Sequence, residues 1–485
     1  MKLYLRGHDC RYAMEQLQLS LFPGEPSSVA EPGELPAPGE DLVVSQLSGG
    51  RQWLTAVTTI TLRGQTHRVA RRIPLTDDER LRRRLLQGCY YDCALHFLPQ
   101  APAWGALSGV RPTKLVTAAL LEGRSRDEAG RELRQVYRVS PQRAELALDC
   151  GEASVRALAR TTPEELSVYV GIPFCPTRCV YCSFISRSCE HERHTLGQYL
   201  QALLDEIDYT GQLLRRSGRR ISTVYFGGGT PTTLDAGQME QLMAALERAF
   251  DLSHRLEYTI EGGRPDTLSA EKLRLMHRMG ADRMSINPQS MNDHVLALAG
   301  RQHTAAMVEQ AVAQAREAGF AELNMDLIAG LPGDSFDSFA RSLERVLALR
   351  PENITVHTLA LKKAAALYER REGLPPEETV AQMVGWAWQT LRRQGYVPYY
   401  LYRQKYMSGS FENIGWCIPG HECLYNIYMM EEQQSILALG GGGITKLVKD
   451  GRIERWNGPK DPLQYLSRPE ELRRKKDEFF AALGR

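Results

Sequence analysis

The sequence has few cysteines for its length, no long apolar run and no segment typical of a secretory leader. Ten cysteines in 485 residues are too sparse for a disulfide framework. The apolar runs are short and interrupted by charged residues, which excludes a membrane-spanning helix. The opening residues MKLYLRGHDC hold no apolar stretch ahead of a cleavage site. These absences predict a cytoplasmic protein without a membrane span.

An excess of charge of either sign is also absent. Lys and Arg total 60 and Asp and Glu total 58, so the formal net charge is +2. Bulk electrostatics therefore does not select the partner, and we expect no nucleic-acid partner. The hydrophobic fraction of 43% is ordinary for a globular chain. Because single cores rarely grow past about 250 residues, we expect two or three domains.

The first part of the chain predicts an α+β domain over residues 1–165. β-branched residues on both sides of Arg63-Gly64-Gln65 indicate a hairpin with a glycine turn. Thr76 and Glu79 have the spacing of a capping box ahead of a basic helix. The function of this domain cannot be derived from its residues.

From residue 166 onward, short apolar segments alternate with amphipathic ones. The predicted strands cover 167–174, 221–226, 256–261, 283–286, 323–328 and 354–359. Six βα units in succession predict a parallel sheet, open or closed as a barrel, with its site at the carboxyl ends of the strands. We therefore expect a core over residues 166–375 and a substrate-side extension over 376–485.

A cysteine array directly follows the first of these strands. Cys175, Cys179 and Cys182 form a C-x3-C-x2-C pattern that can converge on one metal centre without long-range folding. Thiolates select iron–sulfur clusters or zinc. Zinc would need a fourth protein ligand, and a zinc site stays open as the structural alternative. The candidates for that fourth ligand are Cys189, His191 and His194.

Polar and glycine residues follow the later strands. Three glycines after the second strand remove every Cβ and allow close backbone approach to a ligand. Carboxylate and amide side chains at strand ends suit ribose hydroxyls and an ammonium group. The residues concerned are Gly227, Gly228, Gly229 and Thr230, then Glu261, Gln289 and Asp326.

With Tyr181 before Cys182, the array resembles the C-x3-C-x-aromatic-C signature of the radical S-adenosylmethionine (SAM) superfamily. The resemblance implies a [4Fe–4S] cluster on Cys175, Cys179 and Cys182, with SAM bound at the fourth iron. It also implies an α/β fold, a partial (β/α)6 TIM-like barrel, and one-electron cleavage of SAM to a radical that abstracts hydrogen. The glycine run, Gly227 to Thr230, resembles the motif that binds the SAM amino group.

The wider set of motifs is similar to the oxygen-independent coproporphyrinogen III oxidase family. The matches include Ile172-Pro173-Phe174, the GGGTP run, and Asp326-Leu327-Ile328 with Gly330-Leu331-Pro332. The resemblance implies SAM contacts from Tyr169, Glu261, Gln289, Arg301 and Asp326. Segments near Arg111 and Val356, together with the tail, resemble the coproporphyrinogen dehydrogenase (HemZ) branch of that family.

Membership would imply oxidative decarboxylation of coproporphyrinogen III propionates to vinyl groups, giving protoporphyrinogen IX in haem biosynthesis. The tetrapyrrole would be the substrate, and a flavodoxin or ferredoxin the low-potential electron donor. Aromatic residues from Tyr396 to Trp416, with Arg403 and Lys405 among them, are candidates for the wall of a macrocycle cavity. No catalytic residue beyond the cofactor contacts is identified.

The sequence also departs from the family pattern. Phe184 stands where characterised oxidases carry a further cysteine, and Gly171 where they carry a histidine. Residues 425–430 lack the H-N-x-x-Y-W element of the haem-chaperone branch. The final segment resembles only the beginning of the usual small C-terminal domain, so we expect a substrate lid to be missing or replaced by residues 1–165. A haem- or tetrapyrrole-binding chaperone-like protein, and another radical SAM tetrapyrrole-modifying enzyme, remain alternatives.

Overall fold

The computed structural model describes residues 1–22, 25–107, 109, 111–184, 186–362, 364–370, 372–403 and 411–484. The chain divides into two compact units, Met1–Asp149 and Cys150–Arg485. The finer division at residues 165 and 375 stays a prediction. In the described ranges, no helix is both long and apolar enough to span a bilayer.

The first unit is built on a five-stranded sheet with the order β2-β1-β3-β4-β5. The strands are β1 (Lys2–Arg6), β2 (Ser28–Val29), β3 (Leu42–Gly49), β4 (Trp53–Leu62) and β5 (Gln65–Pro74). The helices are α1 (Arg11–Leu21), α2 (Glu79–Ala94), α3 (Thr113–Leu121), α4 (Arg126–Arg131) and a π-helical turn at Glu132–Val136, and α5 (Pro141–Leu158) crosses into the second unit. The predicted hairpin is confirmed, because β4 and β5 pair antiparallel around Arg63 and Gly64.

The predicted capping box at Thr76 is wrong by two residues. Asp78 is the N-cap of α2, and its carboxylate accepts hydrogen bonds from the backbone N–H groups of Arg80 and Leu81. The Thr76 hydroxyl instead accepts from the backbone N–H of Asp78, at 3.1 Å. A carboxylate one residue before the helix caps it directly, so Thr76 is left to order the preceding turn.

The second unit contains the six predicted strands, which lie side by side and parallel in one sheet. They are β6 (Glu165–Ile172), β9 (Arg220–Gly228), β10 (Glu257–Glu261), β11 (Arg283–Ser285), β12 (Glu322–Ala329) and β13 (Asn353–Thr358). Val, Ile, Leu and Met are the commonest of their buried residues, as expected for parallel strands covered on both faces, and the remainder include several buried Thr and Ser. Parallel pairing brings all six carboxyl ends to one edge.

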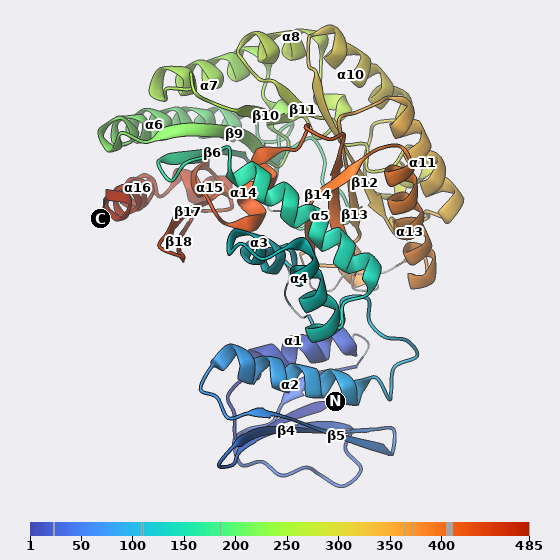
Figure 1. The fold of residues 1–485 in the computed structure, drawn as a ribbon. Helices are drawn as coiled ribbons and strands as arrows, with labels where there is room; N and C mark the ends of the chain where they lie inside the picture. The colour runs from blue at the N-terminus through green and yellow to red at the C-terminus, as the bar shows by residue number, and fades with distance from the viewer. Residues whose placement is uncertain are drawn as a thin grey trace. The chain divides into compact units, whose positions relative to one another are not determined.

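Helices connect these strands and cover the outer face of the curved sheet (Figure 1). The helices on this face are α6 (Arg193–Ser217), α7 (Ala236–Ala249), α8 (Ala270–Arg278), α10 (Ala305–Glu317), α11 (Phe336–Ala348) and α13 (Glu377–Arg393). Two short helices, α9 (Asp293–Leu298) and α12 (Leu367–Arg370), lie beside the loop after β6 instead. 3-10 turns lie at Pro231–Thr233 and Pro265–Thr267, and a short β7 (Phe174–Cys175) pairs with β8 (Arg187–Ser188). The repeated strand–helix order matches the predicted α/β class.

The C-terminal residues extend the same sheet at both ends, giving the order β14-β15-β13-β12-β11-β10-β9-β6-β16-β17-β18. The added elements are β14 (Val397–Arg403), β15 (Glu412–Cys417), α14 (Leu424–Glu431), β16 (Ser435–Gly440), β17 (Ile444–Lys449), β18 (Arg452–Asn457), α15 (Pro462–Leu466) and α16 (Pro469–Gly484). β16 pairs in parallel with β6. In the part of the chain that the structure describes, the outer strands β14 and β18 do not pair with each other, so the barrel is partial.

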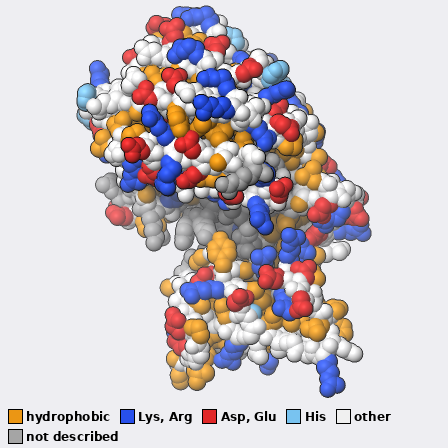
Figure 2. Space-filling view, turned by 90° about the vertical axis from the view of Figure 1, so that its left-hand side faces the viewer, with side chains coloured by type: hydrophobic (Ala, Val, Ile, Leu, Met, Phe, Trp, Pro, Cys, Tyr) orange, Lys and Arg blue, Asp and Glu red, His pale blue; other side chains and the backbone are white. Residues whose placement is uncertain are grey.

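Surface charge follows the balanced composition. On the face shown in Figure 2, basic and acidic side chains are interspersed rather than gathered by sign. This arrangement agrees with the near-zero net charge, and the described residues on this face form no large patch of one charge that would attract a charged partner.

Candidate active site

The predicted site residues of β6, β9 and β10 meet at the carboxyl edge of the sheet. Gly171 pairs in register with Gly227, at the ends of β6 and β9. A Cβ added to Gly227 would lie 3.0 Å from both the Glu261 carboxylate and the Tyr169 ring. Three segments from distant parts of the sequence therefore touch at one point, as predicted.

The cysteine array lies on the loop after β6. Cys175 ends β7, and its Sγ lies 3.5 Å from the Thr230 hydroxyl. A turn joins the other two cysteines, because the Cys182 N–H donates to the Cys179 carbonyl at 3.1 Å. All three are free thiols and partly exposed. Burial raises the pKa of the Cys175 and Cys182 thiols.

Within the described residues, no three His, Cys, Asp or Glu side chains are grouped to hold a single metal ion. In a [4Fe–4S] cluster each cysteine ligates a different iron. Three thiolates around a cluster therefore need not converge as tightly as the ligands of one zinc ion.

The glycine run shapes the backbone beside this loop. Gly228 has φ +115°, a conformation that side chains disfavour. A Cβ on Gly229 would lie 2.5 Å from the Phe174 carbonyl oxygen, which is closer than atoms can approach. The Thr230 N–H donates to the same carbonyl at 2.7 Å. The glycines thus let the end of β9 pack on the strand that carries Cys175, and their contact with SAM stays a prediction.

Two carboxylates at the edge have opposite electrostatic surroundings. Burial, reinforced by the nearby Asp326, raises the pKa of Glu261 to about 8. Burial also opposes ionisation of Asp326, but hydrogen bonding and charge from His357, with help from Asn324 and Thr355, outweigh it and lower the pKa of Asp326. Asn324 Nδ2 donates to Asp326 at 2.8 Å, and His357 Nε2 lies 3.5 Å from Asp326. Asp326 is therefore the residue poised to be charged.

This contrast predicts a pH-dependent stability. Because folding raises the pKa of Glu261 from 4.5 to about 8, its contribution to the free energy of unfolding is favourable at low pH and is lost as pH rises across that interval. We expect Glu261→Gln, which cannot ionise, to unfold a few degrees higher than the wild type at pH 8.5. The two unfolding temperatures should converge toward pH 5, measured by thermal scans without SAM.

The matched control is Glu271→Gln, on an exposed position of α8. It should follow the wild type at every pH. An offset between Glu261→Gln and the wild type that stays constant from pH 5 to pH 8.5 would contradict the assignment.

Gln289 is positioned for a ligand. Its backbone has φ +67°, and its N–H donates to the Asp326 carbonyl at 2.8 Å. Its side-chain Oε1 is buried, with no hydrogen-bond partner in the described part of the chain. Since buried acceptors are almost always paired, this oxygen fits a donor supplied by a bound molecule. Both SAM's ammonium group and its ribose hydroxyls supply such donors.

Arg301 lies beneath the same edge. It is 7% exposed, and one guanidinium nitrogen donates to the carbonyls of Gly263 and Asn287 at 3.0 and 2.8 Å. Its Nε atom is buried without a partner among the described residues. The structure thus brings Tyr169, Glu261, Gln289, Arg301 and Asp326 to one region, and their contacts with SAM remain predictions.

Sequence reasoning missed Tyr225 and Tyr425. The ring of Tyr425, on α14, stacks on that of Tyr225 at 4.5 Å, and Tyr169 stacks on both at 6.4 and 6.3 Å. Tyr225 precedes the glycine run, which was the available signal. Nothing in the sequence indicates that α14, about 200 residues later, packs against it.

The predicted aromatic wall is wrong for four of its residues, Tyr396, Tyr399, Tyr400 and Trp416, whereas Tyr402 and Phe411 are partly exposed and stay candidates. Tyr399 and Trp416 are each 1% exposed, and Tyr396 and Tyr400 are also buried. Tyr399 and Tyr400 pack with Ala153, Ala157 and α14 in a hydrophobic cluster. Strands β14 and β15 are covered on both faces, so these rings fill the core. Lys405 and Tyr406 lie outside the described residues.

Phe184, in place of the oxidases' further cysteine, is 65% exposed. The Lys362 ammonium group lies 5.9 Å from the centre of its ring. The position thus presents an aromatic face and a cation next to the cluster loop.

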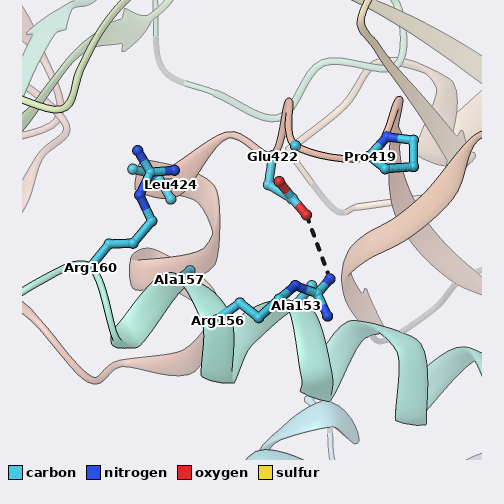
Figure 3. A pocket seen from close by; sticks show the side chains of 8 residues that line it. Ala153, Arg156, Ala157, Arg160, Pro419, Glu422 and Leu424 are labelled. Carbon is cyan, nitrogen blue, oxygen red and sulfur yellow. Dashed lines mark ion pairs between the residues drawn. The ribbon is translucent and has the colours of Figure 1, made fainter.

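A separate hollow of about 410 Å³ lies between α5 and the loop after β15 (Figure 3). It is lined by Ala153, Arg156, Ala157, Arg160, Pro419, Gly420, Glu422 and Leu424. Cys417 pairs with Asn353, the first residue of β13, so this loop starts at the amino ends of the parallel strands. The hollow therefore lies at the edge opposite to the cysteine loop and contains none of the predicted site residues.

Comparison with known proteins also indicates a radical SAM protein. The profile of the Radical SAM superfamily matches residues 169–346. The oxygen-independent coproporphyrinogen-III oxidase-like protein HemZ of Bacillus subtilis is 39% identical over 384 residues, covering 78% of this chain and 76% of HemZ. The heme chaperone HemW of the same organism is 34% identical over 223 residues, covering 45% of this chain and 57% of HemW.

Among solved structures, the coproporphyrinogen III oxidase HemN of Escherichia coli aligns with a TM-score of 0.53 at 27% identity. The alignment covers 65% of this chain and 71% of HemN. The partial barrel predicted from the sequence is confirmed by this likeness together with the strand order.

Proposed function

The chain belongs to the radical SAM family that contains HemZ, HemN and HemW, and on this basis we propose that it oxidatively decarboxylates coproporphyrinogen III. Its cofactors are a [4Fe–4S] cluster and SAM, as in the family. When bound, they supply an organic radical that abstracts hydrogen. In the proposed reaction a propionate loses one hydrogen atom from its β-carbon, then carbon dioxide and one electron to a one-electron acceptor, leaving a vinyl group. Two propionates react in turn, giving protoporphyrinogen IX.

The single observation that carries the proposal is the meeting of the cysteine loop with Glu261, Gln289 and Asp326 at one edge of the sheet. Cys175, Cys179 and Cys182 would hold the cluster. Glu261, Asp326 and the unpaired Gln289 oxygen would hold the ammonium and hydroxyl groups of SAM. Gly227 leaves the space between Glu261 and Tyr169 that a Cβ would fill. The residues fit the cofactor pair.

A second observation favours an enzyme over a haem carrier. The stretch that would hold the chaperone's haem element is α14, and its Tyr425 and Tyr428 are buried at 3% and 0% exposure. The Tyr428 hydroxyl donates to the Ala157 carbonyl at 3.0 Å. Because both tyrosines of this stretch pack in the core, neither is open to ligate haem.

The substrate carries carboxylates, which need local cations. Lys362 and Arg178 both lie on loops at the cluster edge of the sheet, since the Arg178 guanidinium donates to the Ala364 carbonyl at 2.8 Å. We place the propionates near them. A flavodoxin or ferredoxin in the cytoplasm would supply the low-potential electron.

The test is anaerobic incubation of reconstituted protein with coproporphyrinogen III, SAM and a reductant. We expect 5′-deoxyadenosine together with a tetrapyrrole product that has lost two carboxyl groups. Tight haem binding without SAM cleavage would instead support the chaperone-like alternative. A product of different mass would support another radical SAM reaction.

A further inference from the structure

We propose that Tyr181 and Arg301 form a hydrogen-bonded clamp on the sulfur of Cys179 that raises the reduction potential of the cluster. The inference rests on the cluster and not on the identity of the substrate. It assigns to Tyr181 a role as a positioning residue and gives Arg301 a second role besides its predicted contact with SAM.

The clamp is seen in two contacts. Arg301 Nη1 lies 3.2 Å from the Tyr181 hydroxyl and 3.9 Å from Cys179 Sγ, within range of a hydrogen bond to sulfur. The same guanidinium nitrogen therefore approaches the Cys179 sulfur and donates to the Tyr181 hydroxyl, which holds it in place. Arg301 reaches this loop from a segment about 120 residues away in the sequence.

The guanidinium group is fixed in this position. Its second terminal nitrogen donates to the Gly263 and Asn287 carbonyls at 3.0 and 2.8 Å, at the ends of β10 and β11. The cluster loop is held to the neighbouring α9 as well, because the Val180 N–H donates to the Ala299 carbonyl at 3.1 Å. Arg301 therefore cannot swing away from Cys179 without breaking two backbone contacts.

The charge of Arg301 has no counter-ion of its own. Among the described residues it forms no ion pair with an Asp or Glu side chain, while the nearby Arg264 is paired with Asp266 at 2.8 Å. A buried cation is costly unless an anion compensates it. The nearest group that becomes an anion when the cluster is held is the Cys179 thiolate.

These contacts bear on electron entry. Reduction adds one negative charge to the cluster, and hydrogen bonds to a ligand sulfur or a nearby positive charge stabilise the reduced form. Both act in the same direction here. The clamp therefore makes the cluster easier to reduce.

The experiment is a redox titration of the reconstituted cluster, followed by electron paramagnetic resonance, without SAM or tetrapyrrole. We expect Tyr181→Phe to keep full iron and sulfide content and to have a more negative midpoint potential than the wild type. Arg301→Lys keeps the charge but loses the forked contacts, so its potential should also be more negative.

The matched control is Tyr258→Phe. Tyr258 is also buried with an arginine, Arg255, 5.8 Å from its ring centre, but its hydroxyl has no partner in the part of the chain described. Its potential should equal that of the wild type. An unchanged potential in Tyr181→Phe with full cluster content would overturn the proposal, whatever the enzyme does to coproporphyrinogen. If Tyr181→Phe loses the cluster, the test passes to Arg301→Lys, and an unchanged midpoint potential in that variant would overturn the proposal.

Discussion

Cys179→Ala is expected to abolish the brown absorbance of the reconstituted protein and all formation of 5′-deoxyadenosine. With two thiolates left, one more iron of the cluster loses its protein ligand. Among the described residues, the side-chain contact on Cys179 Sγ is that of Arg301, a cation that cannot ligate iron in its place. The side chain is only partly buried, so the fold should persist. Iron and sulfide analysis after anaerobic reconstitution, with visible spectra, measures the loss.

Cys189→Ala is the matched control. Cys189 is partly exposed, and the contact that ties it to the loop is a backbone one, from its N–H to the Cys175 carbonyl at 3.1 Å. The variant should retain the cluster in full. A wild-type protein that binds zinc and loses it in Cys189→Ala would contradict the cluster and support the zinc alternative.

Glu257→Ala is expected to lower the free energy of unfolding by about 2–4 kcal/mol, because leaving a buried backbone donor without a partner costs about 1–3 kcal/mol and two are left here. Glu257 is 2% exposed and lies 3.7 Å from Arg283 Nε. Its carboxylate also accepts from the backbone N–H groups of Leu424 and Tyr425, at 2.7 and 3.2 Å. Alanine would leave these first N–H groups of α14 without a partner and weaken the Tyr425 stack beneath the SAM region.

Urea unfolding of the cluster-free protein measures this change. Glu422→Ala is the control, because its ion pair with Arg156 has a similar length, 3.6 Å, but Arg156 is mostly exposed. We expect a loss of less than about 1 kcal/mol there. Equal effects of the two variants would show that Glu257 does not anchor α14.

The six strands and the cysteine loop could be predicted because their signals are local. Alternation of strands with amphipathic helices defines β6 and β9 to β13, and the spacing of Cys175, Cys179 and Cys182 lies within eight residues. Parallel order then places the strand ends together. For this reason Glu261 and Asp326 could be named in advance, while Tyr169 could be named from the family resemblance.

The remaining features depend on contacts between distant segments. The Tyr181–Arg301 contact joins residues 120 apart, and Tyr425 reaches Tyr225 across 200 residues. A Tyr-rich stretch predicts neither core nor cavity by itself. Tyr399 and Tyr400 belong to the core because α14 and α5 pack over them. The capping residue of α2 shifted because Asp78 competes with Thr76 at the same turn.

The most direct measurement uses coproporphyrinogen III deuterated at the β-carbons of its propionates. The proposed reaction predicts one deuterium in each 5′-deoxyadenosine formed and one new vinyl group for each 5′-deoxyadenosine. Mass spectrometry of the products under anaerobic turnover measures both. Unlabelled 5′-deoxyadenosine with no loss of carbon dioxide would contradict it.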